Sequence, residues 1–430
     1  MNKRSFTKGI TALVVVVGVI AAVVIFWGRD AETETVTLPR PVNPPTFHFA
    51  DGTALDPAKP RDDVLIKKAM AELNEAGISE DELYKNGYTI ELTVDPKAQQ
   101  LAEAAVAEAR AGQPGTLRSA LVAVEPKTGR IVAYMGYQGE KQGIDYARSW
   151  QNPGTAFTPF ALVAFLHKGK RLDATYNGHT ERKFGGVTIN NAQGSNCGEQ
   201  CTVAEAMRIS NNTVFADIAF NETGLKAVAT AAIEAGIPAN IGPQNIPLET
   251  NPDINIVLGG GKYVARPVDM AGAYATFAAN GAKRAPHIVA TVKVSSDGDK
   301  LVWSGDESTV AKPAFSRSDV SENAKIARTV TESLLPAGLP CAENRPCASK
   351  PGDHGCSLTQ KTTNEDSCAA WMTGYTPQIS TAVWFGSDDN SALKDKTGAA
   401  VTGKGLPGQV WQRFMNDYLK GKPVEQFPPL

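Results

Sequence analysis

The stretch Asn152-Pro153-Gly154-Thr155-Ala156-Phe157-Thr158-Pro159-Phe160 decides how this chain is organised. Its Pro153-Gly154 pair predicts a tight turn, and Thr155 is placed to cap the helix that follows. Apolar side chains then continue almost without interruption to Phe165-Leu166. A helix that is apolar on all sides is typical of the interior of a large domain, so we expect this helix to be buried.

Size and charge limit the classes of function. A chain of 430 residues can bury at least one large core. Its formal net charge is −2 and its lysines and arginines do not cluster, so the sequence offers no nucleic-acid-binding surface. No cofactor motif stands out, and we expect no cofactor.

The cysteines indicate an oxidising compartment. There are six of them, and they fall into three short-range pairs: Cys197 with Cys201, Cys341 with Cys347, and Cys356 with Cys368. In an exported chain such pairs predict up to three disulfides, although six cysteines allow fifteen pairings. Zinc binding is the alternative. No spacing is Cys-x-x-Cys, and the only nearby histidine is His354, so we expect no metal site.

The N-terminus predicts a single membrane anchor. Residues 1–9 carry three basic side chains, and residues 10–28 are almost entirely apolar, which is long enough to span a bilayer. The basic flank predicts a cytoplasmic N-terminus and a body outside the cell membrane. A cleaved signal peptide is the alternative, but the apolar run is long for one and no small-x-small cleavage site follows it.

The rest of the chain reads as a linker, a small subdomain and a main domain. Residues 29–61 are rich in proline and predict an extended linker, although Phe47 and Phe49 could dock on the folded body. We expect a linker subdomain at 62–94 and the main domain at 95–430. Strands are predicted near both ends of the main domain and helices in its middle. This order suits an α+β fold in which N- and C-terminal strands share one antiparallel sheet.

Six strings in this sequence together resemble one family. They are Leu92-Thr93-Val94-Asp95-Pro96-Lys97-Ala98-Gln99, Ala120 to Ile131 (ALVAVEPKTGRI), the turn at Pro153, Ser210-Asn211-Asn212-Thr213-Val214-Phe215, Met270 to Ala278 (MAGAYATFA), and Ala370 to Gln378 (AWMTGYTPQ). From about residue 62 onward the chain resembles the transpeptidase half of class A penicillin-binding proteins. The resemblance implies the fold shared by penicillin-binding proteins and serine β-lactamases. Only the linker stands where that family carries a glycosyltransferase domain, so we expect that activity to be absent.

The catalytic motifs of this family are altered in the chain. The family's turn reads Pro-Gly-Ser-x-Phe-Lys-Pro, and its serine and lysine supply the nucleophile and the base. Thr155 and Thr158 occupy those two positions. The family's Ser-x-Asn motif is kept as Ser210 and Asn212, which could still bind a peptide amide. For the Lys-Thr-Gly strand, counting back from Trp371 reaches either Thr359-Gln360-Lys361 or Lys361-Thr362-Thr363. The second register keeps a lysine, Lys361, followed by Thr362, but loses the glycine.

These substitutions predict a catalytically inactive relative. Losing the activation of the nucleophile costs on the order of 10⁴–10⁶ in rate. We therefore expect a membrane-anchored pseudoenzyme of cell-envelope assembly that binds another membrane protein or a peptidoglycan stem peptide. The alternatives are an active D,D-transpeptidase or carboxypeptidase with Thr155 as the nucleophile, and a structural subunit of an envelope complex. A structure in which another serine and lysine face each other in the groove would overturn the prediction of inactivity.

Two of these features also have purely structural interpretations. Ser210 and Asn212 are residue types that often cap helix ends. The segment from Cys341 to Cys368 is predicted to be a disulfide-braced insertion near the cleft, either stabilising or acting as a lid that fills the cleft.

Overall fold

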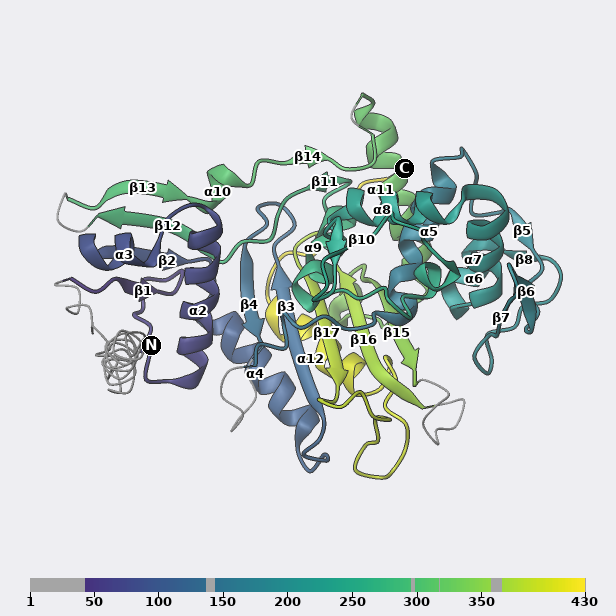
Figure 1. Ribbon diagram of the computed structural model, residues 1–430, viewed down its shortest axis with the longest axis horizontal. Helices are drawn as coiled ribbons and strands as arrows, with labels where there is room; N and C mark the ends of the chain where they lie inside the picture. Colours follow the sequence, from purple (N-terminus) through teal and green to yellow (C-terminus); the bar gives the residue numbers. More distant parts are fainter. Residues whose placement is uncertain (1–42, 137–143, 295–297, 317, 357–365, 430) are drawn as a thin grey trace, which may run out of the picture. The chain divides into compact units, whose positions relative to one another are not determined.

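The computed structural model describes residues 43–136, 144–294, 298–316, 318–356 and 366–429 (Figure 1). The chain divides into two units, Met1–Val42 and Asn43–Leu430, and every described element belongs to the second. None of the helices described in that second unit has the length and apolar character needed to cross a bilayer. The anchor expected at residues 10–28 lies outside the described residues.

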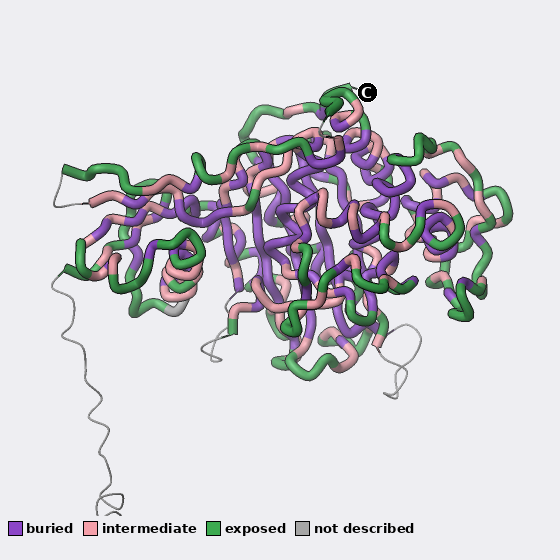
Figure 2. Tube along the Cα trace, turned by 45° about the horizontal axis from the view of Figure 1, so that its top comes forward, coloured by how far each residue is buried: buried purple, intermediate pink, exposed green. Residues whose placement is uncertain are grey.

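The core of the fold is a five-stranded antiparallel sheet in the order β15-β16-β17-β3-β4. Its strands are β3 (Arg118–Val124), β4 (Ile131–Met135), β15 (Ala348–Gly355), β16 (Ser367–Tyr375) and β17 (Ser380–Gly386). Strands from the beginning and the end of the main domain therefore share one sheet, as the sequence predicted. Strands β16 and β17 are buried along their whole length, which Figure 2 shows as continuous purple tubes.

Helices cover both faces of this sheet. Alternate residues of β3 point to opposite faces, so Ala120 and Val122 join one hydrophobic cluster while Leu121 and Ala123 join another. α9 (Pro267–Ala278) packs on the first face, and α4 (Pro96–Arg110) and α12 (Leu406–Leu419) pack on the second. Because both faces are buried, β3, β4, β16 and β17 are mostly apolar rather than alternating, whereas β15 is largely polar.

A group of helices packs beside the first face. Around the buried α5 (Thr158–Leu166) lie α6 (Val203–Ile209), α7 (Asn212–Asp217), α8 (Leu225–Ala235), α11 (Val320–Leu334) and three short helical segments, η1 (Gly154–Phe157), η2 (Ile218–Thr223) and η3 (Ile254–Leu258). Short two-stranded pairs border this group: β5 (Thr175–Tyr176) with β8 (Cys201–Thr202), β6 (Arg182–Phe184) with β7 (Val187–Ile189), β9 (Asn240–Ile241) with β10 (Ile246–Pro247), and β11 (Ala282–Lys283) with β14 (Lys312–Pro313). All nine residues of α5 are buried, as its sequence predicted.

A second sheet has four strands in the order β1-β2-β12-β13, and α2 (Pro60–Glu75) and α3 (Glu80–Asn86) belong to the same part of the chain. It combines β1 (Thr46–His48) and β2 (Tyr88–Leu92) with β12 (Val289–Val294) and β13 (Lys300–Ser304). This small sheet therefore extends beyond the expected 62–94 segment in both directions. Phe47 and Phe49 are buried, so the end of the proline-rich linker is part of the fold.

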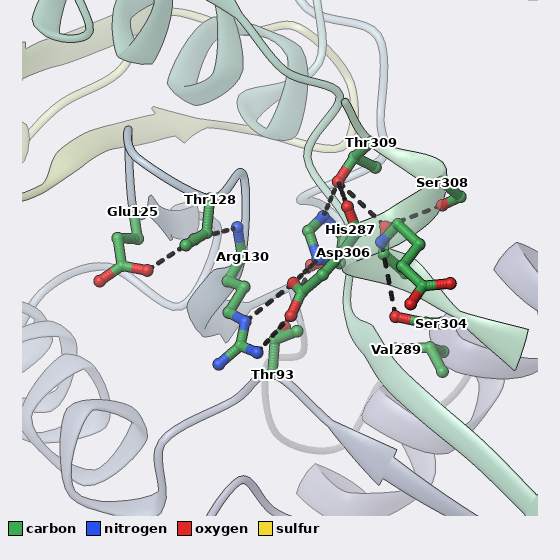
Figure 3. Close-up of polar contacts among 12 residues, drawn as sticks. Thr93, Glu125, Thr128, Arg130, His287, Val289, Ser304, Asp306, Ser308 and Thr309 are labelled. Carbon is green, nitrogen blue, oxygen red and sulfur yellow. Dashed lines mark hydrogen bonds and ion pairs between the residues drawn. The ribbon is translucent and has the colours of Figure 1, made fainter. Parts of the chain in front are cut away.

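The two sheets meet at a cluster of paired charges (Figure 3). Asp306 of α10 (Gly305–Ser308) accepts hydrogen bonds from Arg130 Nε at 2.9 Å and contacts His287 Nε2 at 3.0 Å. Thr93 Oγ1 donates to the carbonyl oxygens of Ile131 and His287. The hydrogen bonds to Arg130 and His287 hold the pKa of the Asp306 carboxyl low, at about 2. We call Arg130, His287 and Asp306 the junction cluster.

The three predicted disulfides are confirmed: Cys197–Cys201, Cys341–Cys347 and Cys356–Cys368. All six cysteines are therefore oxidised, which removes the thiolates that the zinc alternative needed. The first and second bridges close short loops, and the third joins the two ends of the connection between β15 and β16. The segment from Cys341 to Cys368 is thus not one insertion, because β15 within it forms an edge of the central sheet.

Candidate active site

The turn at Pro153-Gly154 is held against the central sheet from several sides. Trp371 Nε1 of β16 donates to the Asn152 carbonyl oxygen at 2.8 Å, and Tyr274 of α9 donates to that of Ala156 at 2.7 Å. Gly154 has a φ of +57°, and a Cβ there would lie 2.5 Å from the carbonyl oxygen of Asp353. Glycine is therefore needed for the turn to approach β15 this closely.

Thr155 does not cap the helix, which corrects the prediction. Neither η1 nor α5 has a side-chain cap. The Thr155 hydroxyl instead donates to the carbonyl oxygen of Pro351 in β15, at 3.2 Å. The side chain thus faces the sheet edge, where a nucleophile would have to stand.

Thr158 lies one helical turn further and is buried, with 3% of its surface exposed. Its hydroxyl donates to the carbonyl oxygen of Val257 in η3, at 3.2 Å. This position therefore holds a satisfied structural hydroxyl and no group that could accept a proton near neutral pH.

Ser210 ends α6 in the left-handed conformation, with φ of +58° and ψ of 47°. The neighbouring Asn211, and not Asn212, caps α7 by accepting from the Val214 amide. Asn212 Nδ2 donates to the carbonyl oxygen of Asn190, whereas its Oδ1 is buried without a hydrogen-bond partner in the described structure. An unpaired buried oxygen of this kind is able to accept an N–H from a bound peptide.

Lys350 brings these residues together. It lies in β15 with 0% of its surface exposed, and its Nζ is 2.5 Å from Ser210 Oγ, 3.3 Å from Thr155 Oγ1 and 3.3 Å from the Pro351 carbonyl oxygen. None of these three contacts is to a carboxylate, and the Asp353 carboxylate acts on the amine through its charge. Burial away from water lowers the pKa of Lys350 to about 7. A serine and a lysine therefore face each other beside the turn, a pair that the sequence analysis did not expect, and inactivity stays a prediction.

The sequence analysis missed Lys350. Its two expected residues, Lys361 and Thr362, lie outside the described residues. Strand β15 pairs with β16 so that Lys350 is opposite Thr373 and Gly352 is opposite Trp371. A Cβ at Gly352 would lie 2.3 Å from the Pro153 carbonyl oxygen, so the strand beside the turn does contain a required glycine.

Comparison with known proteins identifies the family. A family model described as the penicillin-binding protein transpeptidase domain matches residues 119–404, more than half of the chain. The chain belongs to this transpeptidase family. Within it, Lys350-Pro351-Gly352 keeps the first and third residues of the family's Lys-Thr-Gly motif, and this is the signal that could have located Lys350 in the sequence.

Class A penicillin-binding proteins are among the relatives. The chain is 34% identical to penicillin-binding protein 1A of Mycolicibacterium smegmatis over 414 residues, covering 93% of this chain and 49% of that protein. It is 36% identical to penicillin-binding protein 1A of Mycobacterium tuberculosis over 363 residues, covering 82% of this chain and 42% of that protein. The chain thus spans about half the length of the curated relatives it matches.

A solved structure of the family has the same fold. The penicillin-binding protein PonA1 from Mycobacterium tuberculosis superposes with a TM-score of 0.76 at 32% identity, covering 85% of this chain and 92% of that one. The same protein has been solved in complex with penicillin V, with a TM-score of 0.75 to this chain.

Proposed function

We propose that this chain is a transpeptidase-type module of peptidoglycan assembly that accepts an acyl group from D-alanyl peptides, or from β-lactams, on a hydroxyl beside Lys350. The observation that carries the proposal is the buried Lys350 amine between the Ser210 and Thr155 hydroxyls. The charge of the Asp353 carboxylate offsets only part of the cost of burying this lysine, because burial still lowers the pKa of Lys350 to about 7. Its presence next to two hydroxyls therefore favours a chemical role over a structural one.

The proposed chemistry needs only these groups. A neutral lysine amine removes the hydroxyl proton, the oxygen attacks the D-alanyl carbonyl carbon, and the terminal D-alanine leaves as its amine takes up the proton. An acceptor amine or water then releases the acyl group. That PonA1, a relative with this fold, has been solved with penicillin V supports β-lactams as probes.

Incubation with a fluorescent penicillin tests the proposal. We expect one covalent adduct per chain by intact-mass measurement, formed at pH 8 where the amine is neutral. Absence of any adduct after long incubation at saturating penicillin would contradict the proposal.

Non-catalytic binding is a second candidate. It is favoured by Thr158, which cannot act as the usual base, and by the Thr155 hydroxyl, which donates to Pro351. In that case the cleft binds a stem peptide, or the module binds another envelope membrane protein, without turnover. Titration calorimetry with a stem peptide, and co-purification from membranes in mild detergent, would then give binding in the absence of an adduct.

We also propose that residues 10–28 anchor the module in the cell membrane, with residues 1–9 in the cytoplasm. The apolar run and its basic flank support this topology. Protease added to intact spheroplasts should then digest the body of the protein. Protection of the body would contradict the proposed orientation.

A further inference from the structure

Building on the proposed function, we propose that the hydroxyl that accepts the acyl group is Ser210 and not Thr155. Both oxygens lie near Lys350 Nζ, but the distances differ: 2.5 Å to Ser210 Oγ and 3.3 Å to Thr155 Oγ1. The shorter contact places the Ser210 proton where the amine would take it.

The hydrogen-bond partners favour the same assignment. Thr155 has one hydroxyl proton, and it is donated to the Pro351 carbonyl oxygen. In the part of the chain that the structure describes, Lys350 Nζ is the sole hydrogen-bond partner of the Ser210 hydroxyl. A neutral amine has two N–H groups and one lone pair. Its N–H groups match Thr155 Oγ1 and the Pro351 carbonyl oxygen, which leaves the lone pair for the proton of Ser210.

The backbone holds Ser210 in place for this role. Its left-handed conformation is unusual for a residue with a Cβ. The Ser210 amide donates to the Met207 carbonyl oxygen at 3.3 Å, and the Asn211 amide donates to that of Ala206 at 2.8 Å. Ser210 is half-buried, so a substrate can reach it, and its primary hydroxyl is less crowded than the secondary hydroxyl of Thr155.

The reaction balances with these groups alone. The bond from Ser210 Oγ to the carbonyl carbon forms, and the bond from that carbon to the amide nitrogen breaks. The hydroxyl proton passes to Lys350 Nζ and from there to the leaving nitrogen. With a penicillin, the broken bond is the ring amide, so the whole molecule stays attached as a serine ester.

Peptide mapping distinguishes the two hydroxyls. Trypsin cleaves after Arg148 and Arg208, so Thr155 falls in the peptide Ser149–Lys168 and Ser210 in the peptide Ile209–Lys226. The full chain is incubated with penicillin at pH 8, digested and sequenced by mass spectrometry. We expect the adduct on Ser210 in the second peptide.

Three variants complete the test. Ser210→Ala should lower the labelling rate by a factor on the order of 10² or more, whereas the control Ser333→Ala should label within about twofold of the parent chain. Thr155→Val removes an oxygen that accepts from Lys350 and should slow labelling, but its adduct should still be found on Ser210. Ser333 is a suitable control because it is a buried serine whose hydroxyl donates to Val330 instead. An adduct on Thr155 that Thr155→Val abolishes would overturn this inference and leave the proposed function standing. No adduct in any variant would overturn both.

Discussion

The junction cluster and the surroundings of Lys350 differ in whether the ionisable side chain is hydrogen-bonded to a charged partner. At the junction, the Asp306 carboxylate is paired with Arg130 and contacts His287, and its pKa is lowered accordingly (Figure 3). Beside the turn at Pro153-Gly154, the Lys350 amine is fully buried and its described hydrogen bonds are to uncharged oxygens, while the Asp353 carboxylate acts on it through its charge. Paired charges join two parts of a fold, whereas a fully buried amine whose pKa is lowered to about 7 costs stability and is suited to proton transfer.

The largest effect that we expect follows removal of the buried amine. Lys350→Met should lower the rate of penicillin labelling by a factor on the order of 10²–10⁴, because no described group replaces the amine as proton acceptor. The folded state should be as stable as the parent chain or more so, since the methionine removes a buried ionisable group. Fluorescence labelling and thermal unfolding measure the two quantities.

Lys293→Met is the matched control for this variant. Lys293 lies in the small sheet and pairs with Glu91 at 2.8 Å, away from the groove. Lys293→Met should react with penicillin at the same rate as the parent chain. Equal labelling of Lys350→Met and Lys293→Met would remove the main distinction between the two regions.

At the junction we expect a loss of stability with no loss of labelling. Asp306→Ala deprives Arg130 and the buried His287 of their partner and should lower the free energy of unfolding by roughly 2 kcal/mol, about thirtyfold in the equilibrium constant. Urea denaturation measures the change. Asp63→Ala removes an exposed pair with Lys67 and should cost no more than about 0.5 kcal/mol. A similar cost for both variants would show that the junction cluster is not stabilising.

The labelling rate should also depend on pH. Because the pKa of Lys350 is about 7, the neutral fraction of the amine, and with it the rate, should rise about tenfold from pH 6 to pH 8 and then level off. A rate independent of pH over this range would exclude Lys350 as the base.

The same lowered pKa predicts how stability changes with pH. Between pH 7 and the ordinary lysine pKa of 10.5, the unfolded chain binds a proton at Lys350 that the folded chain does not. The free energy of unfolding of the parent chain, measured relative to Lys350→Met, should therefore rise with pH across this window. A difference that falls with pH would contradict the direction of the shift.

The smallest effect concerns the edge of the junction cluster. Thr309 Oγ1 donates to the Gly305 carbonyl oxygen at 3.0 Å and lies 3.4 Å from His287 Nδ1. Thr309→Val should cost about 0.5–1 kcal/mol of unfolding free energy, because it removes these contacts while keeping the shape. Thr329→Val, at a half-buried helical threonine whose hydroxyl donates to the Lys325 carbonyl oxygen, should change stability by only a few tenths of a kcal/mol. If Thr309→Val and Thr329→Val lower the free energy of unfolding equally, the Thr309 hydroxyl does not stabilise the junction cluster.

The sequence was informative where local patterns determine structure. The apolar run after Pro159 predicted the buried α5, and short cysteine spacings predicted all three disulfides. The pairing of early and late strands in one sheet was also predicted correctly, since those strands are continuously apolar.

The sequence was less informative where contacts between distant segments determine the local structure. Residues 348–355 (ASKPGDHG) contain no Val, Ile, Thr, Phe, Tyr or Trp, so nothing local marks them as a strand. They form one because β16 offers a partner along their whole length. Counting back from Trp371 by the family spacing placed the Lys-Thr-Gly motif at residues 359–363 and therefore missed this strand. The low pKa of Lys350 likewise follows from burial that composition does not reveal.

The small sheet has a consequence for how the polypeptide matures. Strand β2 lies between β1 and β12, and Thr89 pairs with Lys293, about 200 residues later. While the ribosome is still making the intervening segment, one edge of β2 has no neighbour, and unpaired edges are prone to aggregation. Strand β2 therefore completes its pairing only once Val289–Val294 has been made, and pairing over such a separation is slow.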